Sequence, residues 1–280
     1  SVTNNNSTAA GQITNIGSGA KDALTLSNTA NGGTFSFRSS DVSGSSDSAT
    51  LTLSNVTGGT ATLASVETLN LVSSGSANTL TGLTAAAATT INVSGSQNLN
   101  AGTANTVATT VDASSLTGNL TFITDNTKAV TVTGGSGNDS ITSTGTAASV
   151  VTINGGAGND TITHSANLGT TDVINGGVGT DTLVSTTTLL AALSINTTTA
   201  KITNIEAIKV SNEYTGGIDT VGEIQASGIT TVTLANQDDT ADDDITSGAV
   251  SITQGSGSQT LNLGASGAAN QSHLGGTLTV

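Results

Sequence analysis

A nine-residue phrase occurs three times in this chain at one fixed spacing. The copies are GGSGNDSIT, GGAGNDTIT and GGVGTDTLV, which begin at residues 134, 155 and 176. Each copy places glycines where a tight turn needs unusual backbone angles or close approach. Each also carries one aspartate, which supplies oxygen ligands, and one apolar residue that can enter a core. Three copies in one register predict a turn that is repeated in space.

The phrases belong to a longer unit of about 21 residues. In one unit we predict a strand at 151–153, a turn at 155–160, a second strand at 161–163 and a return loop. Two series of apolar residues carry the same period upstream and predict six stacked coils from about residue 69 to 184, each burying its apolar face against its neighbours. Before the turn the series is Leu71, Ile91, Val111, Val132, Ile153 and Ile174, and after the turn it is Leu80, Leu99, Leu120, Ile141, Ile162 and Leu183.

The composition is typical of a thin β-structure. Only 1% of the residues are aromatic and 9% are charged, and the chain has no Pro, Cys, Met or Trp. Low hydrophobic content and strong acidity would favour disorder, but the apolar/polar alternation of Val-Thr-Val-Thr at 130–133 is typical of strands. We therefore predict an all-β fold, a parallel β-solenoid or β-roll. It would span residues 69–184, between β-rich regions at 1–68 and 185–280, with one helical turn at 188–193.

The repeated turns predict calcium sites. Turns one period apart in a parallel coil lie above one another, so their carboxylates and carbonyl oxygens face a shared gap. Calcium takes six to eight such oxygens, whereas magnesium resists an all-protein cage. Two complete sites are expected, one between the turns of Asp139 and Asp160 and one between those of Asp160 and Asp181; tight turns without metal are the alternative. The candidate ligands are Gly134, Gly135, Gly137, Asp139, Gly155, Gly156, Gly158, Asp160, Gly176, Gly177, Gly179 and Asp181.

Other acidic residues are weaker candidates. Asp172 occupies the position at which Val130 and Val151 would point inward, so either its strand begins one residue late or it assists a cation. A second acidic cluster is either a solvated loop or a set of carboxylates bridged by calcium. This cluster comprises Asp238, Asp239, Asp242, Asp243 and Asp244. The earlier turns GSANTL, GSQNL and TGNL have Gly and Asn but no aspartate, so we assign them a structural role.

Charge and motif content argue against several functions. The formal net charge of −14 excludes a nucleic-acid-binding surface as the main role and favours cations as partners. No apolar run is long enough to predict a membrane span. We expect no enzyme, because the two histidines, His164 and His273, lack a metalloprotease context and there is no nucleophile motif. His164 is expected on the surface.

The three phrases, together with VDASSLTGNLTF at 111–122, SVETLNLV at 65–72 and NIEAIKVS at 204–211, resemble the calcium-dependent bacterial surface-layer proteins of the RTX type, which are exported by type I secretion. The resemblance covers about the middle half of the chain. It implies a protein at the cell surface that assembles with copies of itself into a lattice. It also implies that Asp139, Asp160 and Asp181 are side-chain ligands of calcium and that the turn glycines give carbonyls.

The chain also departs from that family. Neither a helical domain that anchors to cell-surface polysaccharide nor a C-terminal secretion signal is recognisable before Val280. Two other functions therefore stay open. One is a calcium-stiffened segment of an RTX adhesin that binds ice or another ligand, which regular Thr-x-Thr arrays would favour; Thr131 and Thr133 form one such pair, but it is not repeated cleanly in the other coils. The other is the carrier domain of a secreted enzyme.

Overall fold

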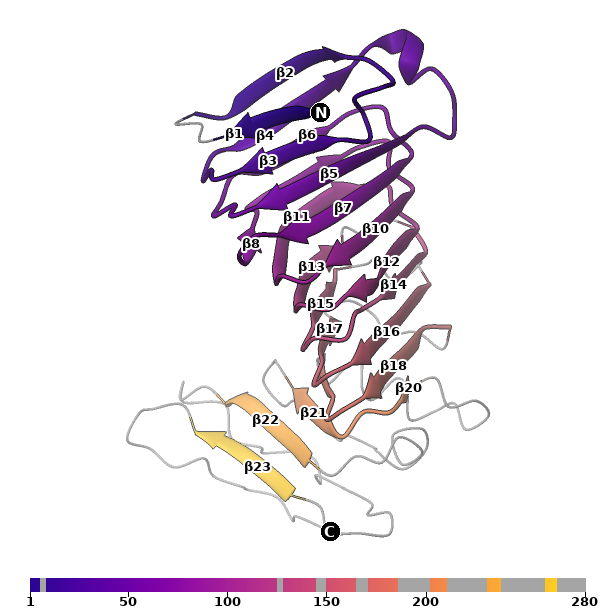
Figure 1. Ribbon diagram of the computed structural model, residues 1–280. Helices are drawn as coiled ribbons and strands as arrows, with labels where there is room; N and C mark the ends of the chain where they lie inside the picture. The colour runs from indigo at the N-terminus through magenta and orange to yellow at the C-terminus, as the bar shows by residue number, and fades with distance from the viewer. Residues whose placement is uncertain are drawn as a thin grey trace.

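In the computed structural model the chain winds into a parallel β-solenoid whose coils stack along one axis (Figure 1). The structure describes residues 1–5, 9–124, 128–144, 150–164, 171–185, 202–210, 231–237 and 260–265. Every strand pairing in these residues is parallel. The all-β prediction and the spacing of about 21 residues between coils are confirmed.

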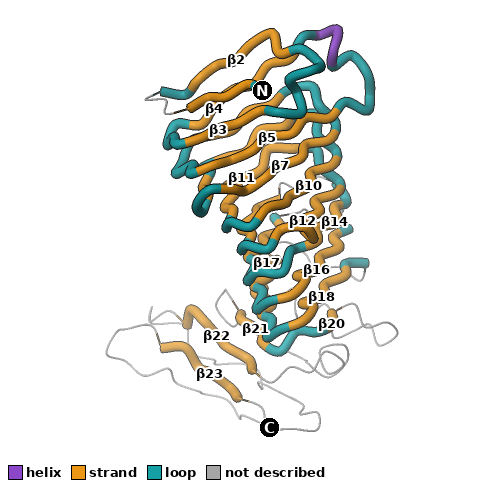
Figure 2. The backbone as a smooth tube through the Cα atoms, in the orientation of Figure 1, coloured by secondary structure: helices purple, strands orange, loops and turns teal. Residues whose placement is uncertain are grey.

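Two sheets form the walls of the solenoid, and the chain crosses from one to the other within each coil (Figure 2). The first sheet has ten strands, in the order β1 (Val2–Asn5), β3 (Leu24–Ser27), β5 (Ser48–Ser54), β7 (Thr68–Ser74), β10 (Thr90–Gly95), β12 (Thr110–Leu116), β14 (Val130–Thr133), β16 (Val151–Ala157), β18 (Val173–Val178) and β20 (Ile202–Thr203). The second sheet follows the order β2 (Gly11–Ile16), β4 (Gly32–Phe37), β6 (Thr60–Leu63), β9 (Gly82–Ala85), β11 (Leu99–Thr106), β13 (Leu120–Thr124), β15 (Ser140–Ser143), β17 (Thr161–His164), β19 (Thr182–Ser185), β21 (Ala207–Val210), β22 (Thr231–Gln237) and β23 (Thr260–Ala265), and β8 (Asn78–Thr79) pairs with β11.

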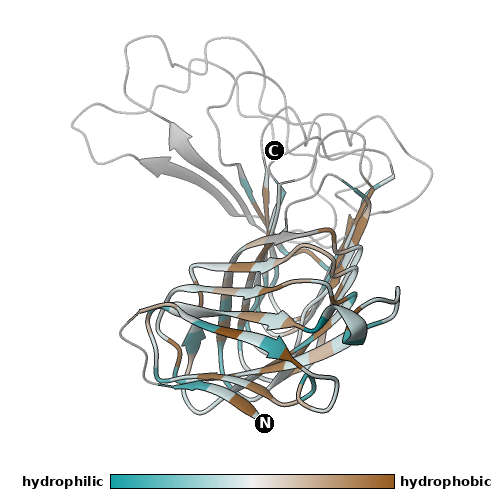
Figure 3. Cartoon of the chain, turned by 90° about the horizontal axis from the view of Figure 1, so that it is seen from above, coloured by the Kyte–Doolittle hydropathy of each residue, from teal (hydrophilic) through white to brown (hydrophobic). Residues whose placement is uncertain are grey.

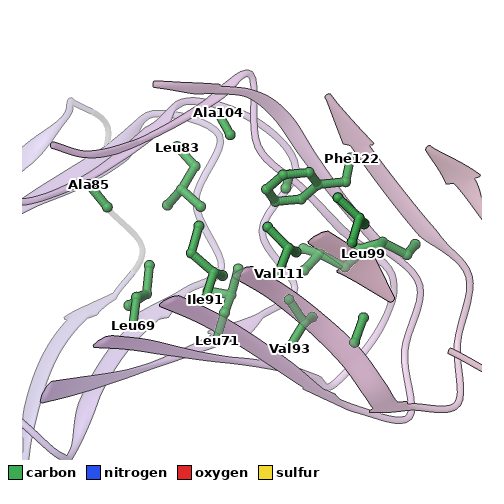
Figure 4. Packing of buried hydrophobic residues seen from close by; sticks show 14 of the residues in the cluster. Leu69, Leu71, Leu83, Ala85, Ile91, Val93, Leu99, Ala104, Val111 and Phe122 are labelled. Atoms are coloured by element: carbon green, nitrogen blue, oxygen red, sulfur yellow. The ribbon is translucent and has the colours of Figure 1, made fainter. Parts of the chain in front are cut away.

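Apolar residues at alternate strand positions build a narrow core between the sheets. In β5 the buried Ala49, Leu51 and Leu53 alternate with half-exposed Ser and Thr residues, as the period of a strand requires. Viewed from above, apolar and polar segments alternate along the strands (Figure 3). Figure 4 shows the packing, with Leu69 and Ile91 of the first sheet pointing toward the second-sheet side chains. Leu, Ile, Val and Ala fill most of this core, and Phe35 and Phe122 are buried among them.

The stack extends beyond the coils that the sequence predicts. β1, β3, β5 and β7 pair in succession, so residues before 69 already belong to the same first sheet. After residue 184, β20 and β21 continue both sheets, and β22 and β23 continue the second. The only helical element in the described residues is η1, a 3-10 turn at Ser39–Asp41. The helical turn predicted at 188–193 lies outside the described residues.

The predicted apolar series before the turn is wrong only at its first member, whereas the series after the turn is wrong at its first step and again between Leu120 and Ile141. Before the turn, the pairing is confirmed from Ile91 to Ile174, but Ile91 pairs with Leu69 and not with Leu71. After the turn, Ile141 pairs with Phe122 and not with Leu120, and Leu80 lies outside the strands. The turn between the sheets is two residues shorter in the glycine-rich coils than in the coil before them. A constant period cannot represent that change.

Candidate metal centre

Seven positions lie level with one another where the chain enters the second sheet, and six of them are buried. We call this row the turn column. The pairing of Ser140 with Thr161, and of Thr161 with Thr182, brings the preceding residues Asp139, Asp160 and Asp181 into line. The same pairings continue the row in both directions. In order, the column is Asn78, Leu99, Leu120, Asp139, Asp160, Asp181 and Glu206.

The three aspartates point into the solenoid. Their exposed fractions are 2% for Asp139, 1% for Asp160 and 0% for Asp181. Each follows its glycine-rich turn directly and precedes β15, β17 or β19. The residues that the sequence selected are thus brought together in one line, on the inner side of the turns.

One oxygen of each carboxylate joins its coil to the coil before it. The backbone N–H of Leu120 donates to Asp139 Oδ1 at 2.7 Å. The N–H of Asp139 donates to Asp160 Oδ1, and that of Asp160 to Asp181 Oδ1, both also at 2.7 Å. Hydrogen bonds to a charged acceptor are short and strong, so this relay ties four successive coils together.

The other carboxylate oxygen, Oδ2, has a hydrogen-bond donor in only one of the three aspartates. Asp139 Oδ2 accepts a hydrogen bond from the N–H of Gly135 at 2.6 Å. Asp160 Oδ2 and Asp181 Oδ2 are buried and have no hydrogen-bond partner. A buried carboxylate oxygen without a partner is costly, whereas a bound cation would satisfy it. The residues present therefore fit a hard cation.

The first glycine of each phrase leaves room for facing oxygens. A Cβ at Gly155 would collide with the carbonyl oxygen of Gly176 and with Asp160 Oδ2. At Gly134 the corresponding neighbours are Gly155 O and Asp139 Oδ2. A turn carbonyl and a carboxylate oxygen thus meet beside each of these glycines. This is the donor type that calcium prefers.

The later glycines of each phrase allow close stacking of the coils. Gly156 and Gly177 have φ angles of 107° and 108°, a region that L side chains rarely adopt. A Cβ on any of these later glycines would also collide with the backbone of the preceding coil. Their geometry explains why glycine is required whether or not their carbonyls bind metal. The remaining glycines with such contacts are Gly135, Gly137, Gly158 and Gly179.

Burial raises the pKa of all three aspartates. For Asp160 the removal of water raises the pKa to about 7; the hydrogen bond from the Asp139 N–H opposes the rise, and the charges of Asp139 and Asp181 add to it. Burial is also the main cause of the raised pKa of Asp139 and of Asp181. Without a cation Asp160 is therefore partly protonated near neutral pH. A divalent cation would compete with that proton.

No three His, Asp or Glu side chains converge as a metal-holding group within the described residues. Neighbouring column positions bring together two carboxylates per gap. A calcium ion there would need carbonyl oxygens and water for the rest of its shell.

Asp172 lies away from the turn column. It precedes β18, which begins at Val173, and its Oδ1 accepts a hydrogen bond from the N–H of Val151 at 2.8 Å. Its Oδ2 lies 3.9 Å from His164 Nε2. His164 is only 2% exposed, so the prediction that it lies on the surface is wrong. It ends β17 at an inward position level with Ser143, so the strand alternation buries it.

Sequence reasoning missed two polar members of the turn column. Asn78 is 1% exposed, and its Oδ1 accepts the N–H of Val56 at 2.9 Å, as Asp139 does for Leu120. Glu206 Oε2 accepts the N–H of Asp181 at 2.7 Å. Both directly precede, or begin, a second-sheet strand, and that position was the available signal. The acidic cluster at 238–244 and His273 lie outside the described residues.

An asparagine ladder follows the outer side of the same turns. Asn98 Oδ1 accepts the N–H of Asn119, and Asn138 Oδ1 accepts that of Asn159. Asn119 and Asn159 make the same bond to the next coil. The structural role predicted for asparagine therefore extends into the glycine-rich coils.

Comparison of the chain with protein-family models, with curated proteins and with solved structures finds no match. Functional inference therefore rests on the geometry of the coils and on the resemblance of the phrases.

Proposed function

We propose that this chain is a structural subunit of an extracellular surface layer or matrix, stiffened by calcium and assembled with copies of itself. The observation that carries the proposal is the pair of buried, unpartnered oxygens, Asp160 Oδ2 and Asp181 Oδ2, in the turn column. The resemblance of the glycine-rich phrases to RTX-type surface-layer proteins supplies the location at the cell surface.

Calcium would act on the coils mechanically. It would neutralise buried carboxylates that otherwise repel one another, and it would hold consecutive turns at a fixed separation. Asp139, Asp160 and Asp181 would provide side-chain oxygens, and the turns would provide carbonyls. Because the gaps exist only when the coils are stacked, binding and folding would be linked.

The outer surface of the solenoid suits a scaffold. Outward strand positions carry mostly Thr, Ser and Asn, and the chain has a formal net charge of −14. Copies with this charge repel one another until cations screen or bridge them. Calcium would therefore favour both the stiff coil and the contact between subunits. By the family resemblance, cell-surface polysaccharide would be bound by a region other than these coils.

Electron microscopy of the purified protein tests the assembly. With added calcium we expect a periodic sheet or tube, and with magnesium or excess chelator we expect dispersed particles. Asp160→Asn, which removes the central carboxylate of the column, should assemble only at higher calcium concentration. Dispersed rods at every calcium concentration would contradict the proposal.

One observation favours a second candidate, the binding segment of an adhesin. Five threonines stand in register on the outer face of the first sheet, at the strand spacing of about 4.8 Å. Such a row of hydroxyls could match a periodic ligand such as ice. They are Thr68, Thr90, Thr110, Thr131 and Thr152. Inhibition of ice recrystallisation by wild type, lost in Thr110→Glu, would favour this function over the scaffold.

A further inference from the structure

A fourth acidic residue continues the turn column past the last glycine-rich phrase. The pairing of Thr182 with Ala207 places Glu206 level with Asp181. The N–H of Asp181 donates to Glu206 Oε2 at 2.7 Å, and the N–H of Glu206 donates to the carbonyl oxygen of Asp181 at 3.1 Å. The first of these bonds repeats the link by which Asp160 and Asp181 hold the coils before them.

The coil that carries Glu206 has no glycine-rich phrase, and its turn is shorter. Glu206 follows the first-sheet residue Ile202 by four positions, whereas Asp181 follows Ile174 by seven. Glutamate is one methylene longer than aspartate, so it reaches the same N–H across a tighter turn. Side-chain length thus compensates for turn length.

The same coil supplies a turn carbonyl in the right place. A Cβ at Gly176 would collide with the carbonyl oxygen of Asn204 and would lie 2.6 Å from Asp181 Oδ2. Gly176 O occupies the corresponding place beside Gly155. Asn204 has a φ of 51°, and its Nδ2 donates to Asn175 Oδ1 at 2.7 Å, which fixes the turn.

Asp181 provides a second observation that indicates a ligand. Its side chain is fully buried, its Oδ2 has no hydrogen-bond partner, and this oxygen faces the spot beside Gly176 that Asn204 O also faces. A carboxylate oxygen of Asp181 and a carbonyl oxygen thus converge beside Gly176, and the hydrogen bond from the Asp181 N–H holds the Glu206 carboxylate next to this coil. Glu206 is only half-buried, so water can complete the shell of a hard cation.

We propose that Asp181, Glu206 and the carbonyl oxygen of Asn204 form a third inter-turn calcium site, which joins the last glycine-rich coil to the coil at 202–210. The site rests on the proposed function, because it assumes that the turn column binds calcium. If this site binds calcium, a gap between two coils needs a glycine-rich phrase on only one side to hold an ion.

Counting bound ions tests the site. Native mass spectrometry of the full chain at saturating calcium should show one calcium fewer in Glu206→Gln than in wild type. Glutamine keeps an oxygen that can accept the Asp181 N–H and removes the charge. Glu67→Gln is the matched control, because Glu67 Oε2 accepts the N–H of Asp47 at 2.8 Å in an early coil without a glycine-rich turn. That control should keep the wild-type count.

Asp160→Asn separates this site from the column as a whole. Loss of ions in Asp160→Asn without loss in Glu206→Gln would overturn the third site and leave the column intact. Loss in neither variant would overturn calcium binding by the column and the third site with it.

A conservative variant covers the case in which Glu206→Gln does not fold. Glu206→Asp keeps the charge and shortens the side chain, so it should keep the wild-type ion count and bind the weakest calcium about tenfold less tightly. Isothermal titration measures that affinity. An unchanged affinity would contradict the assignment of Glu206 as a ligand.

Discussion

Two kinds of side chain fill the turn column in neighbouring coils. Leucine fills it in the coils of Leu99 and Leu120, and aspartate fills it in the coils of Asp139, Asp160 and Asp181. In the apolar coils the column side chain is hydrocarbon, and the N–H of Leu99 donates to the carbonyl oxygen of Asn119 at 2.8 Å. In the acidic coils a carboxylate takes the core position and also accepts the N–H of the coil before it. The backbone stack is continuous across the change.

The difference lies in what each arrangement leaves unsatisfied. Leu99 and Leu120 are buried at 1% and 0% exposure and need no further partner. In the acidic coils Asp160 Oδ2 and Asp181 Oδ2 have no hydrogen-bond partner. The apolar half, residues 49–122, is therefore complete as a folded unit. The acidic half, residues 130–184, needs a cation or protons to satisfy its buried oxygens. Because each coil of a solenoid contacts only its neighbours, one half can loosen while the other stays folded.

Removal of calcium should produce the largest difference between the halves. With excess chelator at pH 7.5 we expect residues 130–184 to lose protection from hydrogen exchange, because the buried carboxylates repel one another once the ions leave. Residues 49–122 should keep theirs. Hydrogen-exchange mass spectrometry with and without calcium measures both segments in one sample. Equal protection of both segments in both conditions would contradict the comparison.

Truncation of a core side chain in the apolar half should destabilise the protein nearly as much as calcium removal does. The loss of stability should be the same with and without calcium. Leu99→Ala removes a buried side chain and leaves a cavity, which should lower the free energy of unfolding by about 3 kcal/mol with or without calcium. Asp160→Asn should destabilise the protein only when calcium is present. Urea denaturation of both variants, each with and without calcium, measures the four free energies of unfolding. A calcium-dependent cost for Leu99→Ala would mean that the halves are coupled.

The contrast between halves also explains what the sequence could predict. The fold, its period and the line of Asp139, Asp160 and Asp181 follow from residue type and spacing alone. The register at Leu120 could not be predicted, because the turn length changes by two residues there and only the pairing of Phe122 with Ile141 reveals it. Glu206 was missed because its coil reaches the column with a shorter turn and a longer side chain.

Buried polar residues were harder to predict than apolar ones. His164 was expected on the surface, since a histidine at a strand end is usually solvated. His164 is buried because the strand alternation of β17 turns it inward, where Asp172 of the next coil lies beside it. His164 and Asp172 come close only because the two coils stack. Period and composition do not carry information of this kind.

Proton binding should alter the acidic half in the absence of calcium. The pKa of Asp160 is raised to about 7 in the folded chain from an ordinary value of 3.8, so the folded state binds the proton more tightly than the unfolded state. The stability that this proton gives is complete below about pH 4 and is lost as the pH rises through about 7. Calcium binding should strengthen over the upper part of the same range, because it requires the deprotonated carboxylate.

Asp160→Asn isolates this effect from the other acids. Asparagine imitates the neutral carboxyl group, so without calcium the variant should exceed wild type in stability, and by a larger margin at pH 8 than at pH 5. Urea denaturation at the two pH values, at constant ionic strength, measures the difference. A wild-type apo protein that gains stability relative to Asp160→Asn as the pH rises would reverse the predicted sign.

The smallest effect should come from the asparagine ladder, which is common to both halves. Asn98 Oδ1 and Asn159 Oδ1 each accept one backbone N–H from the next coil at 2.9 Å, and both side chains are exposed. Water can replace an exposed acceptor, so Asn98→Ala and Asn159→Ala should each cost about 1 kcal/mol or less. Urea denaturation with calcium should give the same value for the two. A much larger cost for Asn159→Ala would show that the outer rim of the acidic turns also supports the cation gaps, and the contrast between halves would then extend beyond the turn column.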